Sequence, residues 1–410
     1  MPKGFALAVI VAAIGTVARP DTQPRRPSGT LVVSNMQDNT ATVLDAQTGR
    51  VVATLRTGEA PHEVAISHDG RWALVSNYGV RERPGSSLTV IDLVRARVER
   101  TIDLGAWRRP HGMAFFPGDT LVAVTSETGQ VVLLVDFRDG RVAGTLATKG
   151  RATHMLAMAA RGDRLFTANI ADGTITQLEV PPRQDGKVIP VGRQPEGIAT
   201  SPDGNTVWVG SNRDSIVVIV DARRGVVTDT LRGFGMPYRM AVSADARLAV
   251  ITDPVRANVR VYETASLRER FVIPIPRDSL VATAEVAGSP SPEGVALSRD
   301  GRWAFVTLQG RNRVATIDLE RGFITGYAPT GTWSDGIGYS RLTARPSGRG
   351  HAKKSSELLA PLHHEARITA AARFPDASDI RQKPSLNGAM GVVDVQLQDP
   401  DTEAHVCLDD

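Results

Sequence analysis

Short apolar runs separated by polar turns follow one another along most of the chain. The segment from residue 195 to 231 shows the full pattern: apolar runs at Gly197–Ser201, Thr206–Gly210, Ile216–Asp221 and Val226–Leu231, separated by a Pro-Asp-Gly turn, a polar loop and an Arg-Gly turn. Runs of this length, bounded by such residues, are typical of β-strands. A four-stranded unit that recurs at a period of about 40 residues predicts a propeller blade.

Seven copies of the first strand of this unit can be aligned. Their fourth position is always Val, Met, Leu or Ile, and their fifth is Ala in six copies and Gly338 in the last. Because blades taper toward a central axis, a tiny residue lets neighbouring sheets approach while the larger one fills the space between them. We therefore predict seven blades within residues 29–341. The inner-strand segments are 61–67, 110–116, 153–159, 195–201, 237–243, 292–298 and 334–340.

The two ends of the repeat array complement each other. Three predicted strands, at 30–35, 39–46 and 50–56, precede the first inner strand, and one lone inner strand, Asp335–Ser340, follows the last complete unit. Together they make one blade, and ring closure removes the exposed edges of an open array. The expected fold is an all-β, seven-bladed β-propeller in which the N-terminal strands complete the last blade.

The segments outside the repeats have their own composition. Residues 1–18 combine basic Lys3 with an apolar run from Phe5 to Val17 and a small-residue exit at Ala18, which predicts a signal peptide, followed by a polar linker at 19–28. The run is shorter than the roughly 20 residues that span a bilayer, and no later stretch is long and apolar enough to cross one. We expect a periplasmic or secreted protein. Residues 342–410 carry no further repeat and are interpreted as a tail of uncertain structure, with a small extra domain as the alternative.

Composition excludes several kinds of site. The single cysteine, Cys407, rules out an internal disulfide and a cysteine-based metal site. The chain contains no G-x-S-x-G, P-loop or H-E-x-x-H motif. Only 5% of its residues are aromatic, and basic stripes interleaved with aromatic residues are what nucleic-acid binding needs, so nucleic acid is not an expected partner.

The repeat motifs also carry a family resemblance. They include SPDG at 201–204, TVWVGSN at 206–212, ALVSN at 73–77, LTVID at 88–92 and VATID at 314–318. This pattern of turn, strand end and following strand resembles the YVTN-repeat β-propellers, in particular the YncE-like exported proteins. The resemblance implies the fold over about residues 29–341. It does not imply one activity, because related propellers include lactonases, haem-binding domains and surface-binding proteins.

Polar residues gather where a shared binding face is expected. In a four-stranded meander, the loop entering the first strand and the loop between the second and third strands lie at the same end of the blade. The second aligned positions of the inner strands are His62, His111, His154, Glu196, Tyr238, Glu293 and Asp335. The second-to-third loops begin with Asn35, Asn77, Glu127, Asn169, Asn212, Asp253 and Gln309. These residues predict a polar rim around one mouth of the central channel.

Three of the rim residues are histidines in successive blades. Neutral imidazole suits zinc and other transition metals, and carboxylates suit these or calcium. The candidate ligands of a divalent metal ion are therefore His62, His111, His154, Glu196 and Glu293. The alternative is that these residues cap their loops by hydrogen bonds to backbone.

The remaining rim residues are candidates for binding an organic ligand. Two insertions, Gly79–Ser87 and Pro274–Ser291, lengthen loops on this face, and loops on a rigid scaffold often carry recognition. Arginines in the same loops favour an anionic ligand. The candidate ligand-binding residues are Tyr238, Asp335, Asn77, Glu127, Asn169, Asn212, Asp253, Arg108, Arg109 and Arg239.

Two functions fit this rim. The first is an exported propeller that binds a small molecule, a metal ion or a protein partner at the channel face without converting it. The alternative is a metal-assisted hydrolase of the lactonase type, in which a cation held by the same rim polarises a carbonyl group and activates water.

Overall fold

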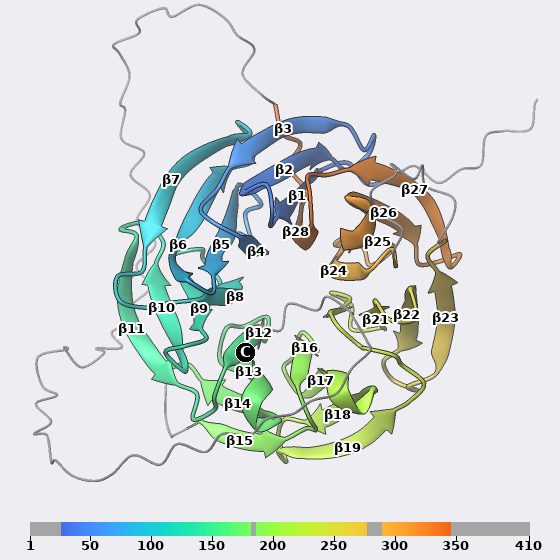
Figure 1. Ribbon diagram of the computed structural model, residues 1–410. Coiled ribbons are helices and arrows are strands. Elements are labelled where there is room, and N and C mark those ends of the chain that lie inside the picture. Colours follow the sequence, from blue (N-terminus) through green and yellow to red (C-terminus); the bar gives the residue numbers. More distant parts are fainter. Residues whose placement is uncertain (1–25, 182–185, 277–288, 346–410) are drawn as a thin grey trace, which may run out of the picture.

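Seven four-stranded antiparallel sheets surround a central axis in the computed structural model, which describes residues 26–181, 186–276 and 289–345 (Figure 1). The predicted all-β, seven-bladed propeller is confirmed. The predicted signal peptide, most of the linker and the tail beyond residue 345 lie outside the described residues, as does most of the Pro274–Ser291 insertion.

Blades 1 to 3 follow the chain in order. Blade 1 consists of β4 (Pro61–Ile66), β5 (Trp72–Val80), β6 (Arg83–Asp92) and β7 (Arg97–Asp103). Blade 2 consists of β8 (Pro110–Phe115), β9 (Leu121–Ser126), β10 (Val131–Asp136) and β11 (Arg141–Ala147). Blade 3 consists of β12 (Thr153–Met158), β13 (Arg164–Asn169), β14 (Thr174–Glu179) and β15 (Lys187–Pro190).

Blades 4 to 6 continue the ring, and the two ends of the described chain share blade 7. Blade 4 consists of β16 (Pro195–Thr200), β17 (Thr206–Ser211), β18 (Ile216–Asp221) and β19 (Val226–Leu231). Blade 5 consists of β20 (Met240–Val242), β21 (Leu248–Asp253), β22 (Asn258–Glu263) and β23 (Glu269–Pro274). Blade 6 consists of β24 (Pro292–Leu297), β25 (Trp303–Leu308), β26 (Arg313–Asp318) and β27 (Phe323–Pro329). Blade 7 consists of β28 (Ser334–Ser340), β1 (Thr30–Asn35), β2 (Thr40–Asp45) and β3 (Val51–Arg56).

Ring closure follows the predicted scheme. β28 lies beside β1 in Figure 1, and the two strands pair with Thr30 opposite Ser340 and Val32 opposite Gly338. Hydrogen bonds to the ring continue past the expected end of the propeller at residue 341. Arg345 N donates to Val94 O at 2.9 Å, so the chain stays attached to blade 1 through that residue.

One inner strand is shorter than predicted. The repeat predicts an inner strand at 237–243 in blade 5, whereas β20 covers only Met240–Val242. The loop before β20 is held by a side chain: the Asp253 carboxylate accepts hydrogen bonds from Gly235 N at 2.7 Å and Met236 N at 3.0 Å.

The hydrophobic core is divided among the blade interfaces. In the described part of the chain, each of the seven interfaces between neighbouring blades has its own cluster of buried apolar side chains. The cluster between blades 6 and 7 contains fully buried Trp303 and Phe305 packed with Leu31 and Val33. Because strand β1 supplies apolar residues to this interface, ring closure buries apolar side chains in addition to pairing the strand edges.

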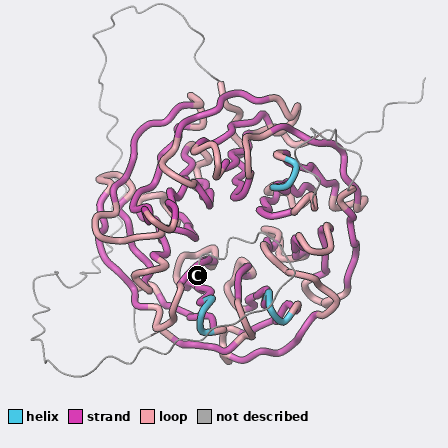
Figure 2. The backbone as a smooth tube through the Cα atoms, viewed as in Figure 1, coloured by secondary structure: helices cyan, strands magenta, loops and turns pink. Residues whose placement is uncertain are grey.

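In the described part of the chain, helical structure is confined to three single-turn 3₁₀ helices in the loops after second strands (Figure 2). They are η1 (Ile170–Asp172), η2 (Asn212–Asp214) and η3 (Gln309–Arg311). Among the residues that the structure describes, no helix has the length and apolar character needed to cross a membrane.

Candidate functional site

A β-bulge at the start of the inner strand shapes the channel in six of the seven blades. In blade 1, Pro61 pairs with Asn77 and Val64 with Val75, so three steps along β4 match two steps along β5. The same irregularity occurs in blades 2, 3, 4, 6 and 7. A bulge leaves an extra residue unpaired and re-aims the side chains there. The second and third aligned positions, which carry the predicted rim, lie in this bulge.

Hydroxyl groups on second strands hold the rim residues of the next blade. Thr307 Oγ1 donates to Asp335 O at 2.7 Å, and Thr252 Oγ1 donates to Glu293 O at 2.8 Å. Thr125 Oγ1 makes the corresponding contact with His154 O at 2.5 Å. The backbone of each of these rim residues is therefore positioned by the neighbouring blade as well as by its own sheet.

The residue at the third aligned position of the inner strand either allows close packing between blades or adds a charged side chain to the channel. It is glycine in four blades, and a Cβ at Gly336 would lie 2.3 Å from His62 O, while one at Gly197 would lie 2.4 Å from Tyr238 O. Blades 1 and 5 instead have Glu63 and Arg239 at this position. Arg239 was predicted as a rim residue, but Glu63 was missed. Glu63 could have been identified from the sequence, because it is a charged residue at an aligned position that is glycine in four blades.

These two residues form an ion pair between blades 1 and 5. Nε and Nη2 of Arg239 donate to Glu63 Oε1 at 3.0 and 2.9 Å. Nη1 of Arg239 donates to Glu196 Oε1 of blade 4 at 2.7 Å. Because blades 1 and 5 lie on different sides of the ring (Figure 1), the guanidinium group bridges the channel.

The network continues through one histidine. Nε2 of His154 lies 2.9 Å from Glu196 Oε1, and Nδ1 lies 3.1 Å from Glu127 Oε2. Tyr78 OH donates to Glu127 Oε2 at 2.6 Å and accepts a hydrogen bond from Arg109 Nη1 at 2.8 Å. Tyr78 lies at the base of the predicted Gly79–Ser87 insertion, which forms a hairpin extension of β5 and β6. It was not among the residues predicted from the sequence.

Charge pairing outweighs burial for the central pair. Burial by itself would raise the pKa of Glu196, but His154 and Arg239 lower it to about 2. Burial would lower the pKa of His154, but the neighbouring carboxylates of Glu196 and Glu127 raise it to about 10. At neutral pH this histidine is a cation held between two carboxylates.

The other two rim histidines are neutral. His62 stacks on the Tyr78 ring with 4.3 Å between centroids, and its Nδ1 lies 3.0 Å from Ala60 O. The ring of His111 lies 3.6 Å from that of His154, centroid to centroid, and neither of its nitrogens has a hydrogen-bond partner among the described residues. Burial lowers the pKa of His62 to about 3 and that of His111 well below its usual value.

Two further carboxyl groups belong to blades 6 and 7. Burial raises the pKa of Glu293 to about 7, although Ser291 Oγ donates a hydrogen bond to its Oε1 at 2.6 Å. Burial and the nearby Glu63 carboxylate raise the pKa of Asp335 well above its usual range, and its Oδ1 has no partner among the described residues. The ring of Tyr238, another member of the predicted column, has its centroid 4.3 Å from the Arg239 guanidinium carbon.

Several of the predicted residues of the second-to-third loops hydrogen-bond within or near those loops. Asn77 Oδ1 accepts from Gly58 N at 3.0 Å, and Asn169 Nδ2 donates to Thr176 Oγ1 at 2.9 Å. Asp253 binds the loop before β20, as described above. Asn212 is buried and its side-chain amide has no partner in the described part of the chain. Arg108 Nη1 donates to the carbonyl oxygens of its own loop, at Gly105 and Trp107.

The described residues include no group of three or more His, Cys, Asp or Glu side chains placed to hold a metal ion. Both nitrogens of His154 are engaged with carboxylates, as shown above. The divalent metal site predicted at His62, His111, His154, Glu196 and Glu293 stays a prediction.

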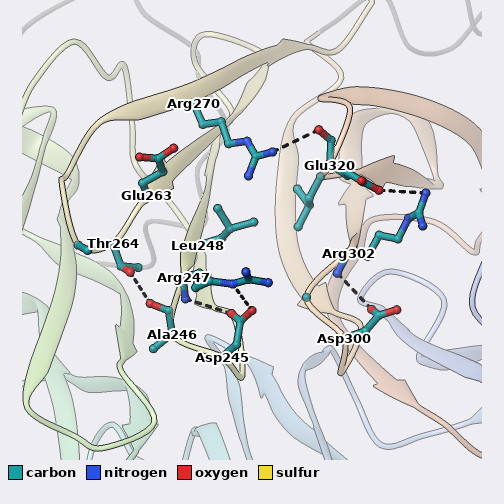
Figure 3. A pocket seen from close by; sticks show the side chains of 13 residues that line it. Asp245, Ala246, Arg247, Leu248, Glu263, Thr264, Arg270, Asp300, Arg302 and Glu320 are labelled. Carbon is teal, nitrogen blue, oxygen red and sulfur yellow. Dashed lines mark hydrogen bonds and ion pairs between the residues drawn. The ribbon is translucent and has the colours of Figure 1, made fainter.

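Two cavities lie on the face opposite the rim. One, of ≈280 Å³, is lined by inner-strand ends of blades 1 to 3, including Ile66, Met113 and Met158. The other, of ≈600 Å³, is a cleft between blades 5 and 6. Figure 3 shows two of its arginines: Arg270 donates a hydrogen bond to the backbone carbonyl of Glu320, and Arg247 forms an ion pair with Asp245.

Fold and site together define a seven-bladed β-propeller whose channel is bridged by a network of buried charged side chains. A family model described as the choice-of-anchor I domain matches residues 183–336, less than half of the chain. No curated protein matches the sequence.

Two solved structures share the fold. A functionally unknown protein from Desulfotomaculum acetoxidans DSM 771 is similar with a TM-score of 0.62 and 14% identity, over 78% of this chain and 100% of that one. The hydrazine synthase of Kuenenia stuttgartiensis is similar with a TM-score of 0.57 and 18% identity, over 74% of this chain and 99% of that one. At such identities the similarity shows the fold alone.

Proposed function

We propose that this protein is an exported propeller that binds a small polar ligand at the rim face of its central channel. The resemblance to YVTN-repeat, YncE-like exported propellers and the predicted signal peptide support export to the periplasm or outside the cell. The partial match to the choice-of-anchor I domain points the same way, toward an extracellular or cell-surface protein.

The observation that carries the proposal is the presence of buried polar atoms without partners at the channel. Both ring nitrogens of His111 and Oδ1 of Asp335 are in this state among the described residues. A buried polar atom that makes no hydrogen bond costs about 1–3 kcal/mol. A ligand that hydrogen-bonds to such atoms recovers this free energy on binding, and buried polar groups in native proteins nearly always have a partner from protein, water or ligand.

The electrostatics make His154 a poor general base, whereas Glu293, whose pKa is raised to about 7, meets the condition for one. A general base works best when its pKa lies near the operating pH. His154 has a pKa of about 10 and shares its protons with Glu196 and Glu127, which makes it a poor base at neutral pH. The lactonase-type, metal-assisted hydrolase stays the alternative prediction, and elemental analysis of the purified protein tests it.

The test replaces the unpartnered imidazole with an apolar ring of similar size. His111→Phe keeps the packing against His154 but removes both ring nitrogens. We expect wild-type protein to be stabilised by polar compounds in a thermal-shift screen, or to release a bound compound on denaturation, and His111→Phe to weaken this binding at least tenfold. His68→Phe, on the opposite face, is the matched control and should bind as wild type. Undiminished binding by His111→Phe contradicts the proposal.

A further inference from the structure

Four carboxyl groups from four inner strands share the channel with one guanidinium group. Glu63 belongs to β4, Glu196 to β16, Glu293 to β24 and Asp335 to β28. Arg239 donates hydrogen bonds to Glu63 and Glu196, and these occupy its Nε, Nη1 and Nη2 atoms. The carboxyl groups of blades 6 and 7 receive none of them.

Glu293 and Asp335 are therefore under-supplied with hydrogen-bond donors. Glu293 is 5% exposed and Asp335 is 2% exposed. Glu293 has one donor, the hydroxyl of Ser291, and Oδ1 of Asp335 has none among the described residues. The charges of Glu63 and Glu196 raise the pKa of both carboxyl groups, whereas Arg239, whose hydrogen bonds go to those two glutamates, lowers it. Burial favours the neutral form of both groups, and a cation bound beside them would favour the ionised form.

The backbone of these two residues is held rigidly. Thr252 Oγ1 binds Glu293 O, and Thr307 Oγ1 binds Asp335 O while accepting a hydrogen bond from Gly294 N at 2.8 Å. A Cβ at Gly294 would lie 2.4 Å from Asp335 O, so the two inner strands are in close contact. Rigid placement on strands is the condition for a selective binding site.

We propose that the carboxyl groups of Glu293 and Asp335 bind the ammonium or guanidinium group of a small organic molecule. The inference rests on the proposed function and assigns a chemical class to its ligand. N–H groups of such a cation supply the donors that Asp335 Oδ1 lacks, and charge-assisted hydrogen bonds of this kind are about twice as strong as neutral ones.

An organic cation fits the site better than a metal ion or an anion. A calcium ion takes 6–8 oxygen ligands and a structural zinc ion takes four ligands, whereas the described residues include no set of three groups placed for a metal ion. An ammonium group needs only one acceptor for each of its three N–H bonds. An anion would face four carboxyl groups with Arg239 already engaged by two of them.

The test compares charged probes with neutral molecules of the same shape. n-Butylammonium and methylguanidinium are titrated into the full chain by calorimetry at constant ionic strength, with n-butanol and methylurea as neutral counterparts. We expect heat of binding and a concentration-dependent rise in Tm with at least one cation and with neither neutral probe. Asp335→Asn and Glu293→Gln keep the shape of each side chain but remove its ability to ionise beside a cation, and each should weaken cation binding at least tenfold.

Asp300→Asn, in the cleft on the opposite face, is the control and should bind the cation as wild type does. Equal responses to charged and neutral probes overturn the inference, as does cation binding that survives both Asp335→Asn and Glu293→Gln. Stabilisation by Ca²⁺ or Zn²⁺ alone, lost in Asp335→Asn, also overturns it. If polar compounds bind in a His111-dependent way while both cations fail, the proposed function stands and the cation assignment is wrong.

Discussion

The rings of His111 and His154 lie 3.6 Å apart, centroid to centroid, at an angle of 32°, yet their environments make one neutral and the other a cation. His154 lies between the carboxylates of Glu127 and Glu196, which raise its pKa. His111 has no such partner, so burial and the positive charge of His154 lower its pKa. At the scale of the residue, one aligned column therefore contains side chains in distinct environments: His154 is part of a charge network, and the ring nitrogens of His111 have no hydrogen-bond partner among the described residues.

The raised pKa of His154 predicts a pH-dependent contribution to stability. Its folded pKa of about 10 exceeds the unfolded value of about 6.5. The stabilisation is thus fully present below pH 6.5 and is lost as pH rises toward 10. The difference in free energy of unfolding between wild type and His154→Gln, measured by urea denaturation, should shrink across this range.

Met155→Leu provides the control for this experiment, because it alters the neighbouring position of β12 without removing a titratable group. Its difference from wild type should be constant with pH. A His154→Gln difference that stays constant or grows between pH 6.5 and 10 would mean that the histidine is not held as a cation.

At the scale of the element, the inner strand both presents side chains to the channel and packs closely against the next blade. Its bulge presents the second and third positions to the channel, and its small residues let the next blade approach. The predicted small fifth column is consistent with this packing, since a Cβ at Gly338 would lie 2.6 Å from Ile66 Cγ1. The glycines of the third column meet backbone atoms of the next blade, and backbone cannot move aside as a flexible side chain can.

Gly336→Ala tests this close approach. The new Cβ would lie 2.3 Å from His62 O, so β28 and β4 must separate. We expect a loss of about 1–3 kcal/mol in the free energy of unfolding, the usual cost of overpacking. Gly144→Ala in outer strand β11 is the matched control, because the nearest atom to its Cβ, Leu134 Cδ1, lies 3.9 Å away. Equal stability of the two variants would show that β28 and β4 can accommodate a Cβ at position 336 without cost.

At the scale of the whole molecule, the ring depends on its closing blade. β1 pairs with β28, and its apolar residues join the clusters shared with blades 6 and 1. Without β1 to β3, β28 would be a lone strand and two blade interfaces would be exposed. Exposed sheet edges and apolar surface of this kind favour aggregation.

Deleting residues 26–57 should therefore abolish cooperative thermal unfolding, as measured by calorimetry or circular dichroism. The matched deletion removes residues 346–410 and keeps the hydrogen bond between Arg345 N and Val94 O. This second variant should unfold with a Tm near that of the full chain. A cooperative transition after the first deletion and its loss after the second would contradict the closure scheme.

The sequence by itself determined the blade count, the closing scheme and nearly all strand positions. These follow from local pattern: turn residues recur at fixed offsets, and apolar runs of five or six residues predict strands wherever they occur. Strands β18 (Ile216–Asp221) and β19 (Val226–Leu231) begin and end where the pattern predicts. The same alignment located the rim column, because equivalent positions of repeated units meet at the axis.

Only the tertiary structure decided which rim residues interact and with what charge. Glu63 and Arg239 are 176 residues apart in sequence and meet between blades 1 and 5. Tyr78 binds Glu127 of the next blade. No local pattern encodes such contacts, because each depends on side-chain length and direction across the channel. The charge states follow from them, since burial and partner charges act through space and not along the chain.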